Sequence, residues 1–156
     1  LTLMILFKTL TSFSQQYENL GDVNWMINLI NEYRHDNKKE TLTLNPKLQK
    51  AAFIQTIDNL IHDKGGHDNT ITKYANIDDR LNKVGYESVF GYYYCENAGR
   101  IYDYDSTEII ENILFEAWQR SPGHNACLLS ILVNKLGYYL LSDDKGNFYG
   151  ILLLAE

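Results

Sequence analysis

The segment that most constrains the fold is residues 117–129, with the sequence AWQRSPGHNACLL. Apolar residues recur at three- and four-residue steps over 109–118, and this spacing predicts an amphipathic helix that runs into the segment. Pro122 and Gly123 then end that helix, since proline lacks an amide donor and glycine tolerates the reversed backbone. His124 follows at the start of a new short turn. An imidazole at such a rigid corner is a candidate site residue, although a lone histidine is more often a cap or a core residue.

Composition places the chain among ordinary single-domain globular proteins. Its 156 residues can bury one core, and 45% apolar with 22% charged residues is typical of such domains. No internal repeat, low-complexity stretch or linker divides the sequence. The formal net charge is -6, and the basic residues are scattered rather than arranged in a stripe. This pattern argues against nucleic acid or an anionic membrane surface as the main partner.

Residues 1–14 are interpreted as the remnant of a secretory signal. The run is mostly apolar, is too short to span a bilayer, and places small residues at Ser12 and Ser14, the two positions that a signal peptidase reads. The alternative is an amphipathic first element of the fold, which Lys8 inside the run would suit. We therefore assign residues 15–156 to a single mature domain without a transmembrane segment.

Capping signals and apolar spacing predict four helices. Asp22 can cap a helix over 23–34, and Asn45 followed by Pro46 begins a second helix that runs to about His62. Two further helices are expected over residues 77–84 and, after a capping box formed by Asp105 and Glu108, up to the histidine corner.

Strand signals are concentrated in the second half of the chain. An aromatic run makes residues 89–95 strand-like and leads to Glu96. Residues 136–141 and 148–154 are predicted to pair as an antiparallel hairpin, with a polar turn between them. Helices before and after a small antiparallel sheet indicate an α+β layered fold.

Five further motifs precede the histidine corner in a fixed order. They are residues 30–34 (INEYR), 44–52 (LNPKLQKAA), His67, 80–86 (RLNKVGY) and 96–98 (ENA). Their order and spacing resemble the CAP superfamily, which groups cysteine-rich secretory proteins, antigen 5 and pathogenesis-related proteins of type 1. The sequence looks most similar to the short secreted bacterial branch, whose corner also reads tryptophan, two variable residues and then Ser-Pro-Gly-His. The resemblance covers roughly residues 23 to 154 and implies a three-layer α-β-α sandwich with a small central antiparallel sheet.

The resemblance also implies a central cleft in which two histidines and two glutamates meet. His67 matches the first histidine by its place after the second helix, and His124 matches the second. Glu96 matches the first glutamate through the ENA motif. The second glutamate is missing, because Ser121 occupies the position three residues beyond Trp118 where the family usually has it.

Two roles are open for Glu96. The neutral imidazoles of His67 and His124 could hold one divalent cation such as zinc, and Glu96 would then complete a three-ligand site with an open position for water. Alternatively, Glu96 orients one imidazole from outside the ligand shell by accepting its N–H. The second role is favoured because the resemblance implies a glutamate that hydrogen-bonds within the cleft. Asn97 is expected to support Glu96 structurally, and Trp118 to anchor the core.

Three other residues have more than one interpretation. Cys95 and Cys127 could approach bridging distance if Glu96 and His124 converge, or they are two small buried residues. A nucleophilic Cys127 activated by His124 is a weaker hypothesis, because no orienting acid or oxyanion donor is evident. Arg80 can pair with a neighbouring aspartate at the surface or reach the core, and the surface role is preferred.

The predicted function is that of an exported or cell-surface bacterial CAP-domain protein that binds a protein partner, lipid or host ligand without catalysis. The alternative is a divalent-metal-dependent, protease-like hydrolase that uses His67, Glu96 and His124. A purely structural role is the remaining interpretation. The missing second carboxylate removes the obvious general base, which favours binding over hydrolysis. The absence of any Asn-x-Ser/Thr acceptor fits bacterial export better than eukaryotic secretion.

Overall fold

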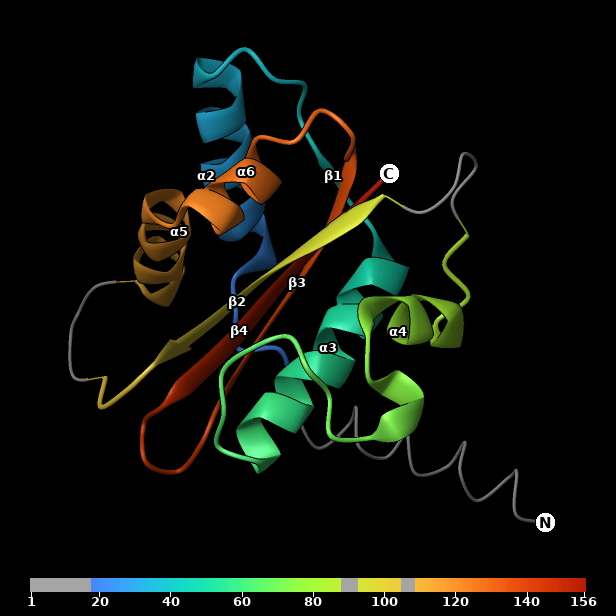
Figure 1. The fold of residues 1–156 in the computed structure, drawn as a ribbon. Helices are drawn as coiled ribbons and strands as arrows, with labels where there is room; N and C mark the ends of the chain where they lie inside the picture. The colour runs from blue at the N-terminus through green and yellow to red at the C-terminus, as the bar shows by residue number, and fades with distance from the viewer. Residues whose placement is uncertain (1–17, 88–92, 105–108) are drawn as a thin grey trace.

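Layers of helices cover both faces of the sheet in the computed structural model, which describes residues 18–87, 93–104 and 109–156 (Figure 1). The predicted signal remnant, residues 1–14, lies outside the described residues. No helix among the described residues has the length and apolar character needed to cross a bilayer. The elements are α2 (Val23–Asp36), β1 (Thr43–Leu44), α3 (Pro46–Ile61), the short 3-10 helix η1 (Thr72–Tyr74), α4 (Ile77–Lys83), β2 (Tyr94–Ile101), α5 (Ile110–Arg120), α6 (Pro122–Leu128), β3 (Lys135–Ser142) and β4 (Phe148–Ala155).

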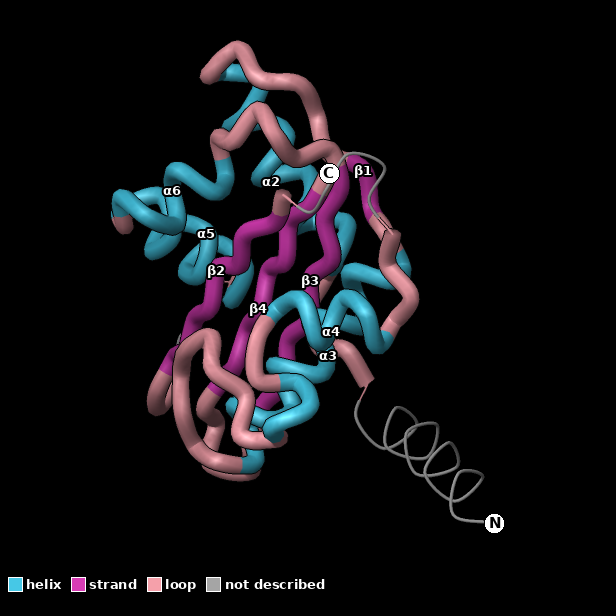
Figure 2. The backbone as a smooth tube through the Cα atoms, turned by 45° about the vertical axis from the view of Figure 1, so that its right-hand side comes forward, coloured by secondary structure: helices cyan, strands magenta, loops and turns pink. Residues whose placement is uncertain are grey.

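The sandwich has α2, α5 and α6 on one side of the sheet and α3 and α4 on the other (Figures 1 and 2). A hydrophobic cluster lies on each face. The first holds Met26, Ile30, Leu114, Trp118 and Leu128, and the second holds Leu48, Ala51, Leu81, Ile151 and Leu153. The predicted α+β fold with three layers is therefore confirmed.

The strands follow the order β1-β3-β4-β2. The predicted hairpin is formed by β3 and β4, and β2 pairs antiparallel with β4 on its other side. The prediction of an antiparallel sheet is wrong for β1, which pairs parallel with the start of β3. Only Thr43 and Leu44 form β1, and a two-residue strand leaves no alternating pattern in the sequence by which it could be recognised.

The first two predicted helix starts are confirmed. The Asp22 side chain accepts a hydrogen bond from the Trp25 N–H at 2.9 Å and begins α2. The Asn45 side chain accepts from the N–H groups of Lys47 and Leu48, with proline in the first turn of α3. The predicted capping box of Asp105 and Glu108 lies outside the described residues, and α5 begins at Ile110.

The aromatic segment was expected to end just before Glu96, but β2 runs from Tyr94 to Ile101. Glu96 and Asn97 therefore lie inside a strand, while most of the predicted strand segment 89–95 lies outside the described residues. The polar sequence of β2 has low intrinsic strand propensity. The strand is stabilised instead by antiparallel pairing with the apolar strand β4. This pairing extends from Tyr94↔Ala155 to Ile101↔Phe148.

The outer edge of β3 is closed by hydrogen bonds along its length. Near the start of the strand, the Asn45 N–H donates to the carbonyl of Leu136 at 2.8 Å. Farther along, Leu20 N–H donates to the Leu140 carbonyl at 3.0 Å, and the Asn19 side chain bonds both the Leu140 N–H and the Tyr138 carbonyl. Strand β2 forms the opposite edge of the sheet.

Candidate functional site

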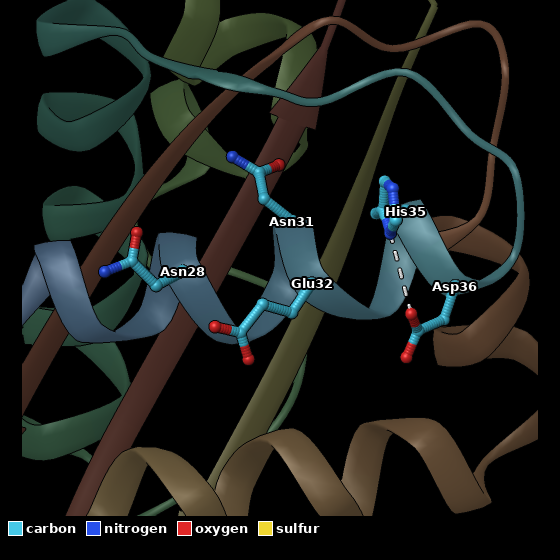
Figure 3. A pocket seen from close by; sticks show the side chains of 5 residues that line it. All are labelled: Asn28, Asn31, Glu32, His35 and Asp36. Atoms are coloured by element: carbon cyan, nitrogen blue, oxygen red, sulfur yellow. Dashed lines mark ion pairs between the residues drawn. The ribbon is translucent and has the colours of Figure 1, made fainter.

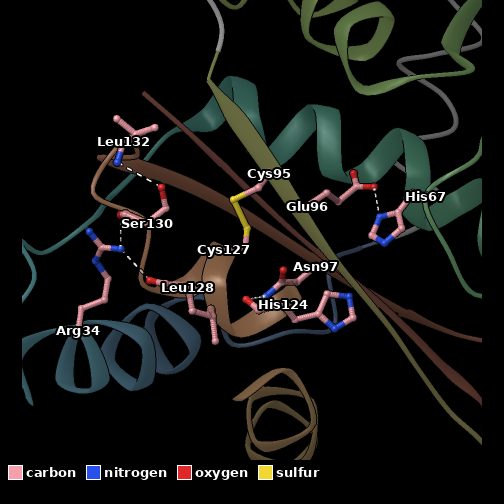
Figure 4. Close-up of a disulfide and its surroundings, with 10 residues drawn as sticks. All are labelled: Arg34, His67, Cys95, Glu96, Asn97, His124, Cys127, Leu128, Ser130 and Leu132. Carbon is pink, nitrogen blue, oxygen red and sulfur yellow. Dashed lines mark hydrogen bonds and ion pairs between the residues drawn. A yellow bond between two sulfur atoms is a disulfide. The ribbon is translucent and has the colours of Figure 1, made fainter. Parts of the chain in front are cut away.

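Strand β2 carries site residues on both of its faces. Successive side chains of a strand point to opposite faces of the sheet. Glu96 consequently faces the α3–α4 layer, and Asn97 faces the α5–α6 layer. His67 lies near Glu96 on one face, and His124 lies near Asn97 on the other, so the candidate site is built around the edge strand β2 (Figure 4).

Glu96 links a buried arginine to an exposed histidine. Its Oε2 lies 2.8 Å from Nη2 of Arg80, and its Oε1 lies 3.1 Å from Nδ1 of His67. The side chains of Arg80 and Glu96 are 0% and 1% exposed, whereas that of His67 is 48% exposed. Both carboxylate oxygens of Glu96 therefore have a partner. One partner is the buried Arg80, and the other is His67, whose imidazole reaches the surface.

Arg80 does not lie at the surface as preferred from the sequence. Besides Glu96, its guanidinium donates to the side-chain oxygen of Gln55 and, at 3.5 Å, to the His67 carbonyl. Its aspartate neighbours do not hold it, and Asp78 instead accepts a hydrogen bond from Tyr94 at 2.6 Å. The partner that draws Arg80 inward is a carboxylate on a different element, which the local sequence of α4 does not reveal.

The loop that carries His67 is held by buried amides of α3. Gln55 donates to the carbonyls of Gly66 and Asp68 at 3.2 and 3.1 Å, and Asn59 donates to Gly66 at 3.1 Å. Both side chains are at most 1% exposed. These bonds satisfy the loop carbonyls and hold the backbone on either side of His67.

His124 is positioned by α6, which begins with Pro122 directly after α5 ends. Asn97 donates to the His124 carbonyl at 3.2 Å. Cys95 and Cys127 form a disulfide with Cα atoms 5.8 Å apart, and this bond ties α6 to β2 (Figure 4). A nucleophilic Cys127 is therefore wrong, because its sulfur is in the disulfide and offers no thiolate.

A buried arginine at the other end of α6 was not recognised from the sequence as a support for the site. Arg34 donates from Nη1 to the carbonyls of Leu128 and Ser130 at 2.7 and 3.0 Å, and from Nε to the carbonyl of Glu40. Burial lowers the pKa of its guanidinium. A cation near the C-terminus of a helix also interacts favourably with the helix dipole, so Arg34 helps to hold α6 in place.

The rings of His67 and His124 face each other at a centroid distance of 6.1 Å, with planes inclined by 54°. Their pKa values move in opposite directions. The hydrogen bond with Glu96 is the main reason that the pKa of His67 is raised. Burial, and then the charge of His67, lower the pKa of His124.

Ser121 lies between α5 and α6, and its side chain makes no capping hydrogen bond to α6. Trp118 is 1% exposed, and its indole N–H donates to the Ala98 carbonyl at 3.1 Å. The fold thus brings His67, Glu96 and His124 together. Asn97 bonds to the main chain of His124, and Trp118 bonds to the main chain of Ala98. No carboxylate occupies position 121.

The imidazoles of His67 and His124 are the candidate ligands for a divalent cation. With metal–nitrogen bonds of about 2.0–2.1 Å, two rings can share one cation with their centroids up to about 6 Å apart. The separation of His67 and His124 lies at this limit. Glu96 would have to give up Arg80 or His67 to become a third ligand, and the described residues hold no group of three or more His, Cys, Asp or Glu suited to a metal. The donor set therefore fits a two-histidine cation site at most.

Two hollows in the described residues lie away from His67 and His124. One of about 450 Å³ lies along α2 and is lined by polar side chains (Figure 3). The other, of about 370 Å³, adjoins the exposed side chains of Ile131 and Leu132. Neither is lined by His67, Glu96 or His124.

The chain is similar to known proteins at the level of structure. No family model and no curated protein matches the sequence. An outer surface protein from Borrelia burgdorferi superimposes with a TM-score of 0.72 and 20% identity over 90% of this chain and 98% of that chain. An extracellular protein containing an SCP domain from Bacillus anthracis gives 0.67 and 19%, over 87% of this chain and 40% of that one.

A cysteine-rich secretory protein from Staphylococcus aureus gives a TM-score of 0.60 with 19% identity, over 89% of this chain and 40% of that one. The CAP domain of enterococcal PrgA gives 0.53 with 17% identity, over 84% of this chain and 58% of that one. These likenesses show that the chain has the CAP fold.

Proposed function

We propose that this CAP-fold chain is an exported or surface-exposed binding module, without catalytic activity, whose recognition surface includes His67 and His124. The partner would be a protein, a lipid or a host ligand. Two observations support the location: the structural neighbours are described as outer surface, extracellular or secretory proteins, and the Cys95–Cys127 disulfide suits an oxidising compartment.

The observation that carries the proposal is the chain of contacts from Arg80 through Glu96 to His67. Burying an ion pair costs several kcal/mol of desolvation, on the order of what the pair regains. This pair adds little stability, but it holds an imidazole that is 48% exposed in one orientation. Fixing an exposed polar ring before a partner arrives reduces the entropy lost on binding.

The same geometry supports binding over hydrolysis. The carboxylate oxygens of Glu96 are both engaged, and Ser121 offers no carboxylate, so neither position supplies a free general base. The second candidate function, a metal-dependent hydrolase, is favoured by the 6.1 Å separation of the imidazoles. A divalent cation held by His67 and His124 would act there as a Lewis acid.

Binding assays with the full chain test the proposal. Immobilised fibronectin, immobilised laminin and vesicles of zwitterionic phosphatidylcholine serve as probes, and we expect one of them to bind the wild type and not the H67A/H124A double variant. His35→Ala is the matched control, because His35 is an exposed histidine on α2, outside the site. Casein cleavage with and without added zinc distinguishes a metal-dependent hydrolase from a binding module. Zinc-dependent cleavage that is lost in the double variant would overturn the proposal in favour of a hydrolase.

A further inference from the structure

The loop between α6 and β3 presents two adjacent aliphatic residues to solvent. Ile131 is 77% exposed, the highest value for a large apolar residue among those described, and Leu132 is 53% exposed. Tyr93, which is 40% exposed, lines the same hollow as these two residues. Single exposed apolar residues are ordinary on a protein surface, but two adjacent ones beside an aromatic ring form a continuous apolar projection. We call Ile131, Leu132 and Tyr93 the apolar tip.

The main chain on both sides of the two aliphatic residues is fixed to the fold. Before them, the buried guanidinium of Arg34 donates to the Ser130 carbonyl at 3.0 Å, and Ser130 Oγ accepts from the Leu132 N–H at 3.2 Å (Figure 4). After them, Asn134 donates through its N–H to β4 and accepts through its carbonyl from β1, each at 3.0 Å. Val133 is 4% exposed and packs in the first hydrophobic cluster. The aliphatic side chains therefore stay outward unless these contacts break.

The segment that carries the aliphatic residues is uncharged. Residues 125–134 contain no Asp, Glu, Lys, Arg or His. Moving a charged side chain out of water is costly, whereas moving an aliphatic one is favourable. This segment can consequently enter an apolar medium without the desolvation of an ion.

The charged residues around the apolar tip are balanced in sign. Loop 36–40 lies beside residues 129–134, because Arg34 also donates to the Glu40 carbonyl at 2.6 Å, and both loops lie at the same end of the molecule (Figures 1 and 2). That loop has two acidic and two basic residues, and the other side of the tip adds one of each sign. These residues are Asp36, Lys38, Lys39, Glu40, Lys135 and Glu156. Such a rim complements a zwitterionic headgroup, whereas an anionic surface attracts a cluster of basic residues.

The size of the apolar tip favours a bilayer over a protein partner. A stable protein–protein interface takes about 20–30 residues from each side, far more than the tip offers. A bilayer closes around whatever enters it, so a small projection suffices for weak insertion. Tyrosine is enriched where hydrocarbon meets the headgroups, because its ring is apolar and its hydroxyl is polar.

We propose that the apolar tip inserts into the boundary between headgroups and acyl chains of a zwitterionic phospholipid bilayer. Ile131 and Leu132 would enter the apolar part, and Tyr93 would lie at the boundary. The hollow beside the tip is not lined by His67 or His124, so this surface is additional to the one in the proposed function. Even a single myristoyl chain binds a membrane only marginally, so the tip would make a reversible contact that orients the protein on the membrane.

Sedimentation of the full chain with phosphatidylcholine vesicles at millimolar lipid is the first test. We expect the wild type to bind, and I131S/L132S to bind at least about tenfold more weakly, because two aliphatic side chains are lost. The matched control is I61S/I71S, which replaces two aliphatic residues that are 56% and 48% exposed on the α3–α4 side. The control should bind within about twofold of the wild type. A wild type that does not bind, or equal losses in the two double variants, would overturn the proposal.

Fluorescence quenching measures insertion even if I131S/L132S fails to fold. Trp25→Phe removes the exposed indole, and the remaining Trp118 is 1% exposed. In this background, vesicles with brominated acyl chains should quench the indole introduced by Ile131→Trp, and should not quench the one introduced by Ile61→Trp. Equal quenching of the two indoles, or none of either, would contradict insertion of the tip.

Three further outcomes would overturn the inference. Binding only to vesicles that contain phosphatidylglycerol, lost at high salt, would indicate electrostatic contact without insertion. Self-association of the lipid-free protein that is lost in I131S/L132S would assign the tip to a second copy of the chain. Vesicle binding that is lost in H67A/H124A and retained in I131S/L132S would place the lipid at the histidines, and the proposed function would then stand without this inference.

Discussion

The guanidinium Nη2 of Arg80 lies 2.8 Å from Oε2 of Glu96, and the two side chains are buried almost completely. Arg80 comes from α4 and Glu96 from β2, so the ion pair joins one helical layer to the edge of the sheet. Glu96 passes this constraint to His67 through its other oxygen. The orientation of the exposed His67 ring thus depends on the buried ion pair between Arg80 and Glu96.

Removing Arg80 is expected to destabilise the protein strongly. Arg80→Met leaves the Glu96 carboxylate buried without a counter-charge, and the free energy of unfolding should fall by about 3–5 kcal/mol in urea denaturation. Adding Glu96→Gln should recover part of the loss, since the uncompensated charge is then gone. The control is Arg120→Met, whose exposed pair with Glu116 is worth at most about 1 kcal/mol. Equal losses in the two single variants would contradict the assigned role.

The opposite pKa shifts of the two histidines predict opposite pH dependences of stability. The folded pKa of His67 is raised, so its contribution is fully present below its unfolded pKa of about 6.5 and is lost as the pH rises through the folded value. The folded pKa of His124 is lowered, so its contribution is present above about 6.5 and is lost as the pH falls through the folded value. Relative to wild type, His67→Gln should therefore cost more stability at acidic pH, and His124→Gln more at alkaline pH.

Nuclear magnetic resonance titration checks the coupling between the rings directly. The charge of His67 is one cause of the lowered pKa of His124, so the pKa of His124 should rise in His67→Ala. A pKa of His124 that stays unchanged in this variant would show that burial alone lowers it.

Loss of the disulfide should affect both stability and site geometry. Cys95 and Cys127 are 32 residues apart, and closing a loop of that length is worth about 3–4 kcal/mol in the chain-entropy description. We expect C95A/C127A to lose about that amount in urea denaturation and to show shifted imidazole resonances for His124. A reducing dithiol should reproduce both effects in the wild type and leave the double variant unchanged. Unaltered resonances would mean that Arg34 and Asn97 suffice to hold α6.

Gly137 tests how closely α3 approaches the sheet. A Cβ at this position would overlap the backbone of Leu48 and Gln49, which cannot move without displacing α3. Gly137→Ala should therefore lower the free energy of unfolding by about 1–3 kcal/mol or more. Gly123→Ala is the matched control, because its Cβ would meet no atom within 4 Å and alanine favours the helix α6. A similar loss in both variants would contradict the close approach of α3 and β3.

The local signals in the sequence predicted most of the fold. Asn45 followed by Pro46 fixed the start of α3, and Asp22 the start of α2, because a cap depends only on residues within one helical turn. The β3–β4 hairpin was visible for a similar reason, since alternation and a polar turn are properties of adjacent residues.

The errors concern features that depend on residues distant in the sequence. Arg80 follows two aspartates on a short helix, and nothing local indicates that Glu96 would draw it into the core. The polar run after Cys95 did not suggest a strand, because β4 supplies its order through pairing. Whether Cys95 and Cys127 bond could not be decided either, since a disulfide depends on a Cα separation that only the folded chain defines.

The hydrogen bonds between Asn19 and β3 place the beginning of the described chain on the side of the sheet opposite β2. The chain enters the sheet at β3, and two strand spacings of about 4.8 Å each separate that strand from β2. A group joined to the protein at Asn19 would therefore meet the sheet on the side opposite the strand that carries Glu96.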